Sequence, residues 1–591
     1  MCGILFSIQT KDPASGDRPN HLTNLFPRLT SAIAARGPDA QDSVQLDVAQ
    51  LILTFSASEL RLRGETLVTQ PHRDADGNLL CWNGEIFEGL NVAPDENDGV
   101  KLLSALAGCC NAYDVSSAFG AIEGPYAFLY YHRSTNTLYF GRDPLGRRSL
   151  LVHHPDAANP YFVLSSVSAG LDPGHSLEEL STAHLFAIDL NVAAGLGDVK
   201  LQSCISSVPR DIGGKSLPFA HPSAVNRTIP NDPPKVESLD SIPPHLTVAV
   251  DELIVHLDRS VMLRVRDIPH RETAAGEARV AVFFSGGIDS TMVAFLADRR
   301  GSLFQDCRHV PPEEPIDLLN VAFENPRKLT VQVEGNVYGL PKREKKQKLR
   351  DPLDYSTVKV TYDVPDRLTG LQEVEELRRL CPHRTWNFLE INVPYEESQS
   401  ARAAVEALMY PSRTVMDLSL AIALYFAARG VGQVRPHAAA DAQPYTSPAR
   451  VLLNGLGSDE LLGGYGRHRT AFKAAGWQAV IDELQTEIDR IPTRNLGRDD
   501  RVISSWGKET RHPFLSLSLV NFLAELPVHL KMDPRLEAGL GEKLLLRLAA
   551  RKLGLVEASS RKKRAMQFGS HSARMAPGEG DRKGDLMLEE K

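Results

Sequence analysis

An apolar run that ends in a loop with two adjacent glycines constrains the fold of this chain more than any other feature. Val280 to Phe284 is continuously apolar, as expected of a buried strand, and the loop Ser285-Gly286-Gly287-Ile288-Asp289-Ser290 follows it directly. The next segment, Thr291 to Asp298, is predicted to be a helix. A strand, a tight loop and a helix in this order are the unit of parallel α/β sheets.

The loop has the chemistry of an anion site. Gly286 and Gly287 let successive backbone N–H groups converge on phosphate oxygens, and a helix N-terminus beside them favours the same charge. Asp289 can help to hold Mg²⁺, while Ser285 and Ser290 can donate hydroxyl groups. A Gly-Gly turn without a ligand is the alternative. The pattern favours a pyrophosphate loop and therefore cleavage of ATP between its α and β phosphates.

A thiol stands at the other end of the chain, directly after the initiator methionine. Removal of Met1 would make Cys2 both nucleophile and N-terminus. Its own α-amino group, with an unperturbed pKa of about 8, can then serve as the base. From Cys2 alone, a buried structural cysteine at the start of a strand is an equally good interpretation.

Several further motifs follow Cys2 in order: Arg36-Gly37-Pro38-Asp39, Arg61, Trp82-Asn83-Gly84-Glu85-Ile86 and Gly141-Arg142-Asp143-Pro144-Leu145-Gly146-Arg147. In type and order they resemble the glutaminase domain of class II glutamine amidotransferases, a family with an N-terminal cysteine nucleophile. With the Ser285 loop included, the whole chain resembles glutamine-hydrolysing asparagine synthetase. The C-terminal half is most similar to the asparagine synthetase domain-containing branch.

The resemblance implies a fold class and a set of glutamine-binding residues. The fold is an α+β N-terminal nucleophile domain followed by an α/β domain with a parallel sheet, of the adenine nucleotide α-hydrolase-like (PP-loop) type. By resemblance, Arg61 binds the α-carboxylate of glutamine and Asp98 binds its α-ammonium. Asn83 and the amide of Gly84 form the oxyanion hole, and Glu85 closes the pocket. A surface charge at Arg61 and a helix N-cap at Asp98 are the alternatives.

A second strand and loop support the nucleotide interpretation. Val451 to Leu453 precedes the segment Asn454 to Glu460, which contains glycines and acidic residues. By resemblance, Asn454 and Gly455 approach ATP and Asp459 approaches Mg²⁺. The resemblance also places a catalytic lysine at Lys563, where a cation would neutralise the charge that builds up on phosphate. Lys562 is an adjacent rival, and a solvated basic run is the alternative for both.

Two positions depart from the family pattern. Leu456 stands where asparagine synthetases carry a glutamate, and leucine can neither accept a proton nor orient an ammonium group. This change leaves ATP binding intact and puts the amidation of aspartate in doubt. Ser516 stands where the family usually has an aspartate.

The domain organisation follows from strand, helix and proline patterns. We expect a glutaminase domain at 1–207, a proline-rich extended linker at 208–246, an ATP-binding domain at 247–575 and a disordered tail at 576–591. The segments 127–131 and 137–140 predict a hairpin, and 316–323 predicts a buried strand. One apolar face predicts a helix that begins the second domain, and its residues are Val250, Leu253, Ile254, Leu257, Val261 and Val265.

Composition is that of a large enzyme of ordinary type. The chain has 591 residues, 42% of them hydrophobic and 24% charged, and a net charge of −8, which argues against nucleic-acid binding by the whole chain. Seven cysteines without paired spacing indicate a reducing compartment and no zinc site.

The longest apolar helix candidate, 418–428, is about half of the roughly 20 residues that span a bilayer. We expect a cytoplasmic protein that does not act on membranes. The basic tract at 342–348 is best explained as a solvated insertion.

The resemblance implies a ligase of asparagine and amino-acid biosynthesis that uses glutamine, ATP and Mg²⁺. Cys2 would hydrolyse glutamine, and the ammonia would attack a carboxylate activated as its adenylate, with aspartate as the acceptor by resemblance. The alternatives are a pseudoenzyme or regulatory scaffold, an amidotransferase with another carboxylate acceptor and, less favoured, a β-lactam synthetase-like cyclase. The sequence is compatible with a homodimer.

Overall fold

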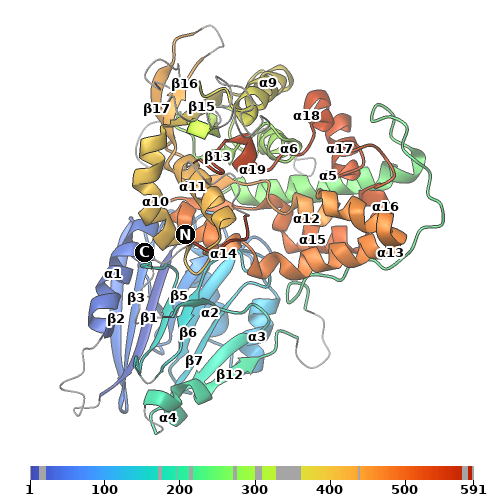
Figure 1. The fold of residues 1–591 in the computed structure, drawn as a ribbon. Helices are drawn as coiled ribbons and strands as arrows, with labels where there is room; N and C mark the ends of the chain where they lie inside the picture. Colours follow the sequence, from blue (N-terminus) through green and yellow to red (C-terminus); the bar gives the residue numbers. More distant parts are fainter. Residues whose placement is uncertain are drawn as a thin grey trace, which may run out of the picture.

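The computed structural model describes residues 2–11, 21–156, 158–170, 176–195, 198–211, 217–269, 276–299, 309–327, 361–436, 440–575 and 584–588. The predicted basic insertion at 342–348 lies outside these residues. Figure 1 shows two packed parts, an N-terminal one dominated by strands and a C-terminal one with many helices.

Two antiparallel sheets of six strands form the N-terminal domain. The strand order in the first sheet is β10 (Glu178–Glu179), β8 (Leu151–His153), β9 (Phe162–Ser165), β1 (Gly3–Thr10), β3 (Leu51–Glu59) and β2 (Ala40–Val48). The order in the second is β12 (Ile205–Val208), β11 (Leu185–Asp189), β7 (Thr137–Arg142), β6 (Tyr126–His132), β5 (Leu79–Gly84) and β4 (His72–Arg73). The predicted hairpin is confirmed as β6 and β7, with Tyr130 opposite Tyr139.

Helices cover the outer faces of these two sheets. Alternate residues of the strands, such as Phe6 and Phe55 from one sheet and Leu129 and Phe140 from the other, form a core between the sheets. Helix α1 (His21–Arg36) packs on the outside of the first sheet, and α2 (Asp98–Leu106) and α3 (Ala112–Gly120) pack on the outside of the second. The short helix α4 (Leu190–Ala193) follows β11. This layering is the predicted α+β N-terminal nucleophile architecture.

A seven-stranded sheet organises the C-terminal domain. Its order is β17 (Gln443–Thr446), β16 (Val431–Val434), β15 (Trp386–Val393), β14 (Ile316–Phe323), β13 (Val280–Phe283), β18 (Val451–Leu453) and β19 (Glu509–Arg511). The five strands from β15 to β19 in this order are parallel, as predicted. The last two strands at one end of the sheet, β16 and β17, pair antiparallel with their neighbours, which the sequence patterns did not indicate.

Helices pack on both faces of this sheet, as its continuously apolar strands require. One face carries α5 (Pro244–Val265), α6 (Ile288–Asp298), α9 (Pro365–Leu380) and α17 (Leu544–Lys552). The other carries α10 (Tyr395–Met409), α11 (Val415–Arg429) and α14 (Leu496–Ser504). The other α-helices of the described residues are α12 (Ser458–Leu462), α13 (Gly466–Arg490), α15 (Leu517–Glu525), α16 (Val528–Lys531), α18 (Val556–Ser560) and α19 (Met566–Gly569). The predicted fold class is therefore confirmed for both domains.

The segment between the two domains is extended and packed. Its described residues 217–243 contain neither helix nor strand, and α5 begins at Pro244, where a missing N–H costs no hydrogen bond. The backbone N–H of Ser223 donates to Asn521 at 2.8 Å, and that of Val225 donates to Gln485 at 2.8 Å. The segment therefore lies along α13 and α15.

The C-terminal tail differs in part from the predicted disorder. Residues 584–588 lie beside the start of α11, where the backbone N–H of Val415 donates to the carbonyl of Leu586 at 2.9 Å. The backbone N–H of Leu588 donates to the carbonyl of Arg413 at 2.8 Å. Backbone hydrogen bonds thus order this short stretch, although its composition is polar.

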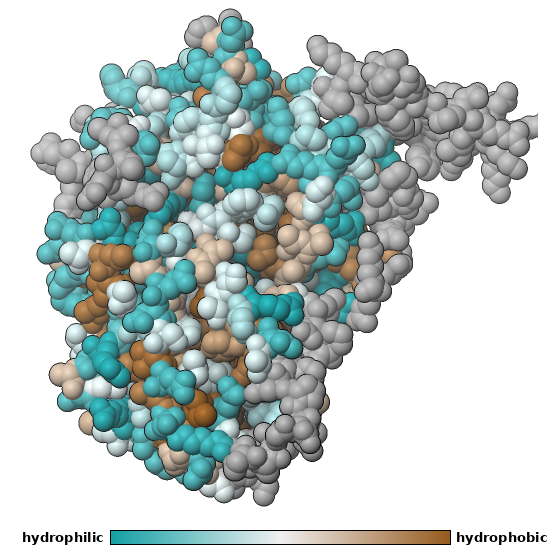
Figure 2. Space-filling view, turned by 90° about the vertical axis from the view of Figure 1, so that its left-hand side faces the viewer, coloured by the Kyte–Doolittle hydropathy of each residue, from teal (hydrophilic) through white to brown (hydrophobic). Residues whose placement is uncertain are grey.

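The surface mixes polar and apolar side chains. On the face shown in Figure 2, apolar residues gather in small groups among polar ones. In the described parts of the chain, no helix combines the length and the apolar character needed to cross a bilayer.

Candidate active sites

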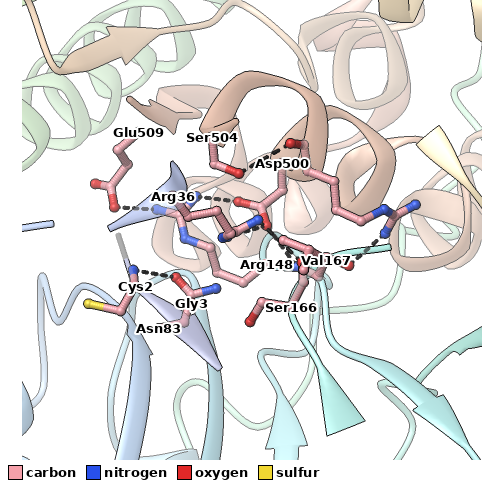
Figure 3. Close-up of polar contacts among 12 residues, drawn as sticks. Cys2, Gly3, Arg36, Asn83, Arg148, Ser166, Val167, Asp500, Ser504 and Glu509 are labelled. Atoms are coloured by element: carbon pink, nitrogen blue, oxygen red, sulfur yellow. Dashed lines mark hydrogen bonds and ion pairs between the residues drawn. The ribbon is translucent and has the colours of Figure 1, made fainter. Parts of the chain in front are cut away.

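Cys2 lies at the start of β1, a central strand of the first sheet, and its side chain is buried. The backbone N–H of Cys2 donates to Asn83 Oδ1 at 3.1 Å, so β1 of one sheet and β5 of the other meet at this point. Figure 3 shows this contact together with residues from the C-terminal domain, including Asp500 and Glu509. The candidate nucleophile therefore lies near the junction of the two domains.

Two side chains that the motif analysis did not single out contact the thiol. The Sγ of Cys2 donates to Glu59 Oε2 at 3.3 Å, and Gln70 Nε2 lies 3.1 Å from Sγ and 2.7 Å from the same carboxylate oxygen. Burial, and then the negative charge of Glu59, raise the pKa of the Cys2 thiol. Gly3 pairs with Ser58 across β1 and β3, which brings Glu59 beside Cys2. Only this long-range register identifies Glu59.

The predicted oxyanion donors, Asn83 and Gly84, lie at the end of β5, where Asn83 contacts Cys2. While Asn83 Oδ1 accepts from Cys2, Asn83 Nδ2 is buried and has no hydrogen-bond partner among the described residues. A buried amide donor without a partner costs free energy, so this atom is available to an oxygen of a bound ligand. Gly84 follows it at the end of β5, where a Cβ atom would lie 2.7 Å from the Trp82 ring. Only glycine fits there.

The two predicted carboxylates of the glutamine pocket are both buried. Asp98 Oδ2 accepts from Trp82 Nε1 at 3.2 Å and from the backbone N–H of Ile86 at 3.0 Å. Burial, and then the charge of Glu85, raise the pKa of Asp98 to about 7. Asn97, rather than Asp98, is the N-cap of α2 and accepts from Val100 at 3.1 Å. The alternative explanation of Asp98 as an N-cap is therefore wrong.

Arg61 and its neighbour Arg63 occupy different environments. The Arg61 guanidinium, which is partly exposed, donates to the carbonyl of Glu65, and its backbone N–H donates to Asp39 at 2.9 Å. Arg63 is buried, and its Nε donates to Glu85 Oε2 at 3.0 Å. Arg63 stands in none of the sequence motifs, although it holds the carboxylate of Glu85, which was predicted to close the pocket.

The loop that begins at Ser285 has a tight backbone geometry that requires its glycines. Gly286 has φ +73°, and a Cβ atom there would lie 2.6 Å from the backbone N of Gly370 in α9. The hydroxyl of Ser285 accepts from the backbone N–H of Gly287 at 3.3 Å, and Ser290 donates to the carbonyl of Gly287 at 3.1 Å. The loop thus packs tightly between β13 and two helices, with its backbone N–H groups at the N-terminus of α6.

The second predicted loop lies beside the first because β18 pairs in parallel with β13. A Cβ atom on Gly455 would lie 2.8 Å from Asp289 Cβ, so the two loops are in contact. The backbone N–H of Asn454 donates to the carbonyl of Arg511 on β19 at 2.9 Å. Both loops emerge from the carboxyl ends of adjacent strands, where ligands bind in sheets of this type.

A cavity of about 370 Å³ opens between these loops. The predicted residues that line it are Ser285, Asp289, Ser290, Asn454, Gly455, Asp459 and Lys563. Gly286 and Gly287 line an adjoining cavity of about 220 Å³, whose wall carries several cations, namely Lys543, Arg547, Arg561, Lys562, Lys563 and Arg564. The structure therefore brings the predicted nucleotide-binding residues together.

Lys543 is a functional candidate that sequence reasoning missed in this half. Its Nζ lies 2.7 Å from Asp289 Oδ2 and 2.7 Å from Asp459 Oδ1, and Lys563 Nζ lies 2.6 Å from Asp459 Oδ2. Although burial opposes it, the charge of Lys543 and then that of Lys563 hold the pKa of Asp459 below its usual value. Two candidate metal-binding carboxylates thus share one lysine.

The two carboxylates fit a magnesium ion held jointly with a nucleotide. Asp289 Oδ1 is buried and has no hydrogen-bond partner in the described structure. Among the described residues there is no cluster of three or more potential ligands from His, Cys, Asp and Glu. Mg²⁺ in nucleotide sites usually takes only one or two carboxylates and completes its shell with phosphate and water.

An aromatic and ionic cluster forms another part of the cavity wall. The Tyr465 hydroxyl donates to Glu460 Oε1 at 2.5 Å, and Lys563 Nζ lies 4.7 Å from the centre of the Tyr465 ring. Arg494 Nη1 pairs with Glu487 at 2.8 Å. Leu456 contributes a partly buried apolar surface to the same cavity. The cavity wall therefore includes the carboxylate of Glu460 and the guanidinium of Arg494, whereas position 456 contributes only an apolar side chain.

Ser516 lies away from this cavity, at the contact between the domains. It is buried and immediately precedes α15, and the backbone N–H of the next residue, Leu517, donates to Glu123 at 3.2 Å. The carbonyl of Leu515 accepts from Arg147 at 2.7 Å. Charged residues of the N-terminal domain therefore supply polar partners to the segment around Ser516.

Known proteins are similar to this chain over most of its length. Residues 472–581 match the family model described as asparagine synthase. The chain is 37% identical over 603 residues to asparagine synthetase domain-containing protein 1 of Gallus gallus, covering 91% of this chain and 93% of that protein. It is 37% identical over 642 residues to the protein of the same name from Homo sapiens, covering 97% and 95%.

Solved structures are similar only loosely. Glutamine phosphoribosylpyrophosphate amidotransferase from B. subtilis, complexed with ADP and GMP, is 12% identical, with a TM-score of 0.27. The match covers 66% of this chain and 81% of that one.

Proposed function

The chain belongs to the family of asparagine synthetase domain-containing proteins, and we propose that it is a glutamine-dependent amidotransferase that transfers ammonia to a carboxylate adenylated by ATP. Aspartate is the first acceptor to consider, with asparagine, AMP and pyrophosphate as products. The observation that carries the proposal is the cavity of about 370 Å³ that collects both glycine loops, Asp289, Asp459 and Lys563.

In the N-terminal site, the proposed chemistry starts at the thiol. After removal of Met1, the α-amino group of Cys2 takes the thiol proton, and the sulfur attacks the side-chain amide carbon of glutamine. Asn83 Nδ2 and the amide of Gly84 donate to the developing oxyanion. The leaving ammonia takes the proton, and water releases glutamate from the thioester. Asp98 in its ionised form pairs with the substrate ammonium.

In the C-terminal site, the backbone amides at Gly286 and Gly287 bind phosphate, and Ser285 and Ser290 supply hydroxyl groups. Mg²⁺, held by Asp289 and Asp459, would neutralise phosphate charge. Lys543 and Lys563 add positive charge beside both carboxylates, where pyrophosphate would leave.

The proposal is tested by pyrophosphate release across a panel of carboxylic acids, aspartate included, with ATP, Mg²⁺ and either glutamine or ammonia. We expect at least one acid to support release. Cys2→Ala should abolish the reaction with glutamine and keep the reaction with ammonia, whereas Asp459→Asn should abolish both. No release above the Asp459→Asn background with any acid would refute the proposal.

Leu456 supports a second candidate, a protein that keeps this fold as a scaffold or regulator without synthetase chemistry. Its apolar side chain occupies the wall where a carboxylate would manage the proton of the attacking ammonia. Glutamine hydrolysis that disappears in Cys2→Ala would count against this candidate. A third possibility is an active amidotransferase whose acceptor is a different carboxylate, one that needs no contact with a carboxylate at position 456.

A further inference from the structure

Arg511, the last residue of β19, contacts both sites at once. Its backbone carbonyl accepts from the backbone N–H of Asn454 at 2.9 Å, and it lies opposite Leu453 in the parallel pairing of β18 with β19. The position of the Asn454 loop, which lines the nucleotide cavity, therefore depends directly on the backbone of Arg511.

The side chain of Arg511 extends in the other direction, into the N-terminal domain. Its Nη2 lies 3.1 Å from Glu85 Oε1, and Glu85 directly follows the proposed oxyanion donors Asn83 and Gly84. The guanidinium carbon also lies 5.5 Å from the centre of the Phe87 ring. Arg511, a residue of the C-terminal domain, thus contacts the residue that directly follows β5 in the proposed glutamine pocket.

Arg511 is fixed in this position by buried partners. Its side chain is 1% exposed, its Nε pairs with Glu509 at 2.5 Å and its Nη1 donates to the carbonyl of Arg264 at 2.7 Å. The second oxygen of Glu85 is held by Arg63 at 3.0 Å. Because buried charges have lost their hydration, each depends on the position of its partners, and a shift of one is transmitted to the next.

The ionic network continues behind the nucleophile strand. Glu509 pairs with Arg148 at 2.9 Å, Arg148 with Asp500 at 3.4 Å, and Asp500 with Arg36 at 2.9 Å. Arg36 donates to the carbonyl of Ser166 at 3.3 Å. Figure 3 shows these groups beside Cys2 and Asn83. A continuous set of buried ion pairs therefore connects β19 with the surroundings of the thiol.

We propose that Arg511 is a positioning residue shared by the two sites, and that through it the binding of a nucleotide changes the reactivity of Cys2 toward glutamine. The inference rests on the proposed function and adds communication between its two sites. When a nucleotide orders the Asn454 loop, the carbonyl of Arg511 moves with that loop, and its guanidinium repositions Glu85. Coupling between binding free energies is reciprocal, so glutamine bound near Glu85 changes the affinity for nucleotide by the factor by which the nucleotide changes the affinity for glutamine.

The test measures labelling of Cys2 in the full-length protein by diazo-oxo-norleucine, an alkylating analogue of glutamine, with and without α,β-methylene ATP and Mg²⁺. Intact mass spectrometry gives the rate, and a thermal shift shows that the nucleotide binds. We expect the nucleotide to change the labelling rate of the wild type by about fivefold or more, the lower end of common allosteric couplings. Arg511→Lys keeps the charge but loses the forked geometry and should lose this change.

Matched variants separate coupling from misfolding. Arg259→Lys alters another ion pair between the domains, with Glu88 at 2.8 Å, and should keep the nucleotide effect. Glu85→Gln serves as a second disruption if Arg511→Lys melts early, and it should reduce the effect in the same way.

Each outcome decides something different. Nucleotide binding without a change in the wild-type labelling rate would overturn the coupling. A change that persists in both Arg511→Lys and Glu85→Gln would overturn the role of Arg511. Failure of the analogue to label wild-type Cys2 would instead refute the proposed glutamine chemistry, and the inference with it.

Discussion

At both sites, the ionisation of single residues depends on other ionisable groups buried beside them. Cys2 lies against Glu59, Asp98 lies near Glu85, and Lys543 lies between two carboxylates. In each case burial disfavours the charged form, and the neighbour either reinforces or opposes that effect. Reactivity at this scale therefore depends on pH and on the identity of one neighbouring side chain.

Replacing Glu59 with glutamine should move the alkylation of Cys2 to lower pH. The charge of Glu59 raises the pKa of the thiol, so its removal stabilises the thiolate, while the effect of burial remains. The rate of reaction with iodoacetamide as a function of pH, followed by mass spectrometry of the peptide that contains Cys2, measures the shift. Asp42→Asn, an exposed change on β2, is the control. Identical profiles for Glu59→Gln and wild type would show that the carboxylate does not act on the thiol.

Glutamine binding should weaken as the pH falls below about 7. The pKa of Asp98 is raised to about 7, and only its ionised form can pair with the substrate ammonium. The KM for glutamine, measured from acidic to mildly basic pH, should therefore rise toward acid in the wild type. In Asp98→Asn it should be high at every pH. A wild-type KM that is constant across this range would argue that Asp98 does not bind glutamine.

The same group has a stability effect of defined sign. Because the pKa of Asp98 is higher in the folded than in the unfolded state, the folded state binds the proton more tightly, and stability falls as pH rises from the usual 3.8 to about 7. The Tm of Asp98→Asn relative to wild type should therefore increase between about pH 5 and about pH 8.

Sequence reasoning identified many of the site residues but missed those that only the tertiary structure brings to a site. The predicted residues include Cys2 and Asn83, which are in contact, and Asp289 and Asp459, which line one cavity. Asp98 was also predicted, and it is buried. Glu59, Arg63, Lys543 and Arg511 were not predicted, because each reaches its site only through contacts with residues distant in the sequence.

Individual elements contribute to the sites mainly through the ends of strands. Strands β13 and β18 lie side by side and parallel, so their two glycine loops meet over one cavity. The strand, loop and helix at 280–298 were predicted correctly from apolar runs and glycines. The antiparallel strands β16 and β17 were not, because strands of four residues carry too little periodicity to be recognised.

The Gly286 loop should tolerate no side chain. In Gly286→Ala the new Cβ would meet the backbone of Gly370 at 2.6 Å and would also carry the strain of φ +73°. Gly276→Ala is the matched control, because φ is +96° and no atom of the described residues lies within 4 Å of the new Cβ position. We expect the control to lose about 1 to 2 kcal/mol from backbone strain, and Gly286→Ala to lose more and to stop binding nucleotide. Thermal unfolding and a nucleotide thermal shift measure both. Equal losses in the two variants would show that the contact with α9 is unimportant.

At the scale of the whole molecule, buried arginines join the two domains. Arg147 of the N-terminal domain donates to the carbonyl of Leu515 at 2.7 Å while pairing with Glu123 at 2.6 Å. Arg36 and Arg148 both reach Asp500. The sequence predicted two domains, but it gave no sign that charged rather than apolar residues would form so much of the contact, since buried ion pairs leave no periodic pattern.

Arg36→Met should destabilise the whole molecule. Its partner Asp500 is fully buried, and removal of one member of a buried pair typically costs about 3 to 5 kcal/mol. Arg227→Met removes an exposed pair with Asp482 and should cost less than about 1 kcal/mol. Chemical denaturation followed by fluorescence gives both free energies of unfolding. Similar values for the two variants would contradict the importance of the buried network.

The extended segment at 217–243 has a practical consequence. Its backbone is bonded to α13 and α15, and Arg535 donates to the carbonyl of Pro233 at 2.7 Å, so this stretch is part of the wall of the C-terminal domain and not a free tether. A protease cut within it would leave two polypeptides that still migrate as one particle. The two domains expressed as separate polypeptides should therefore assemble, because the buried contacts between them do not depend on the covalent link.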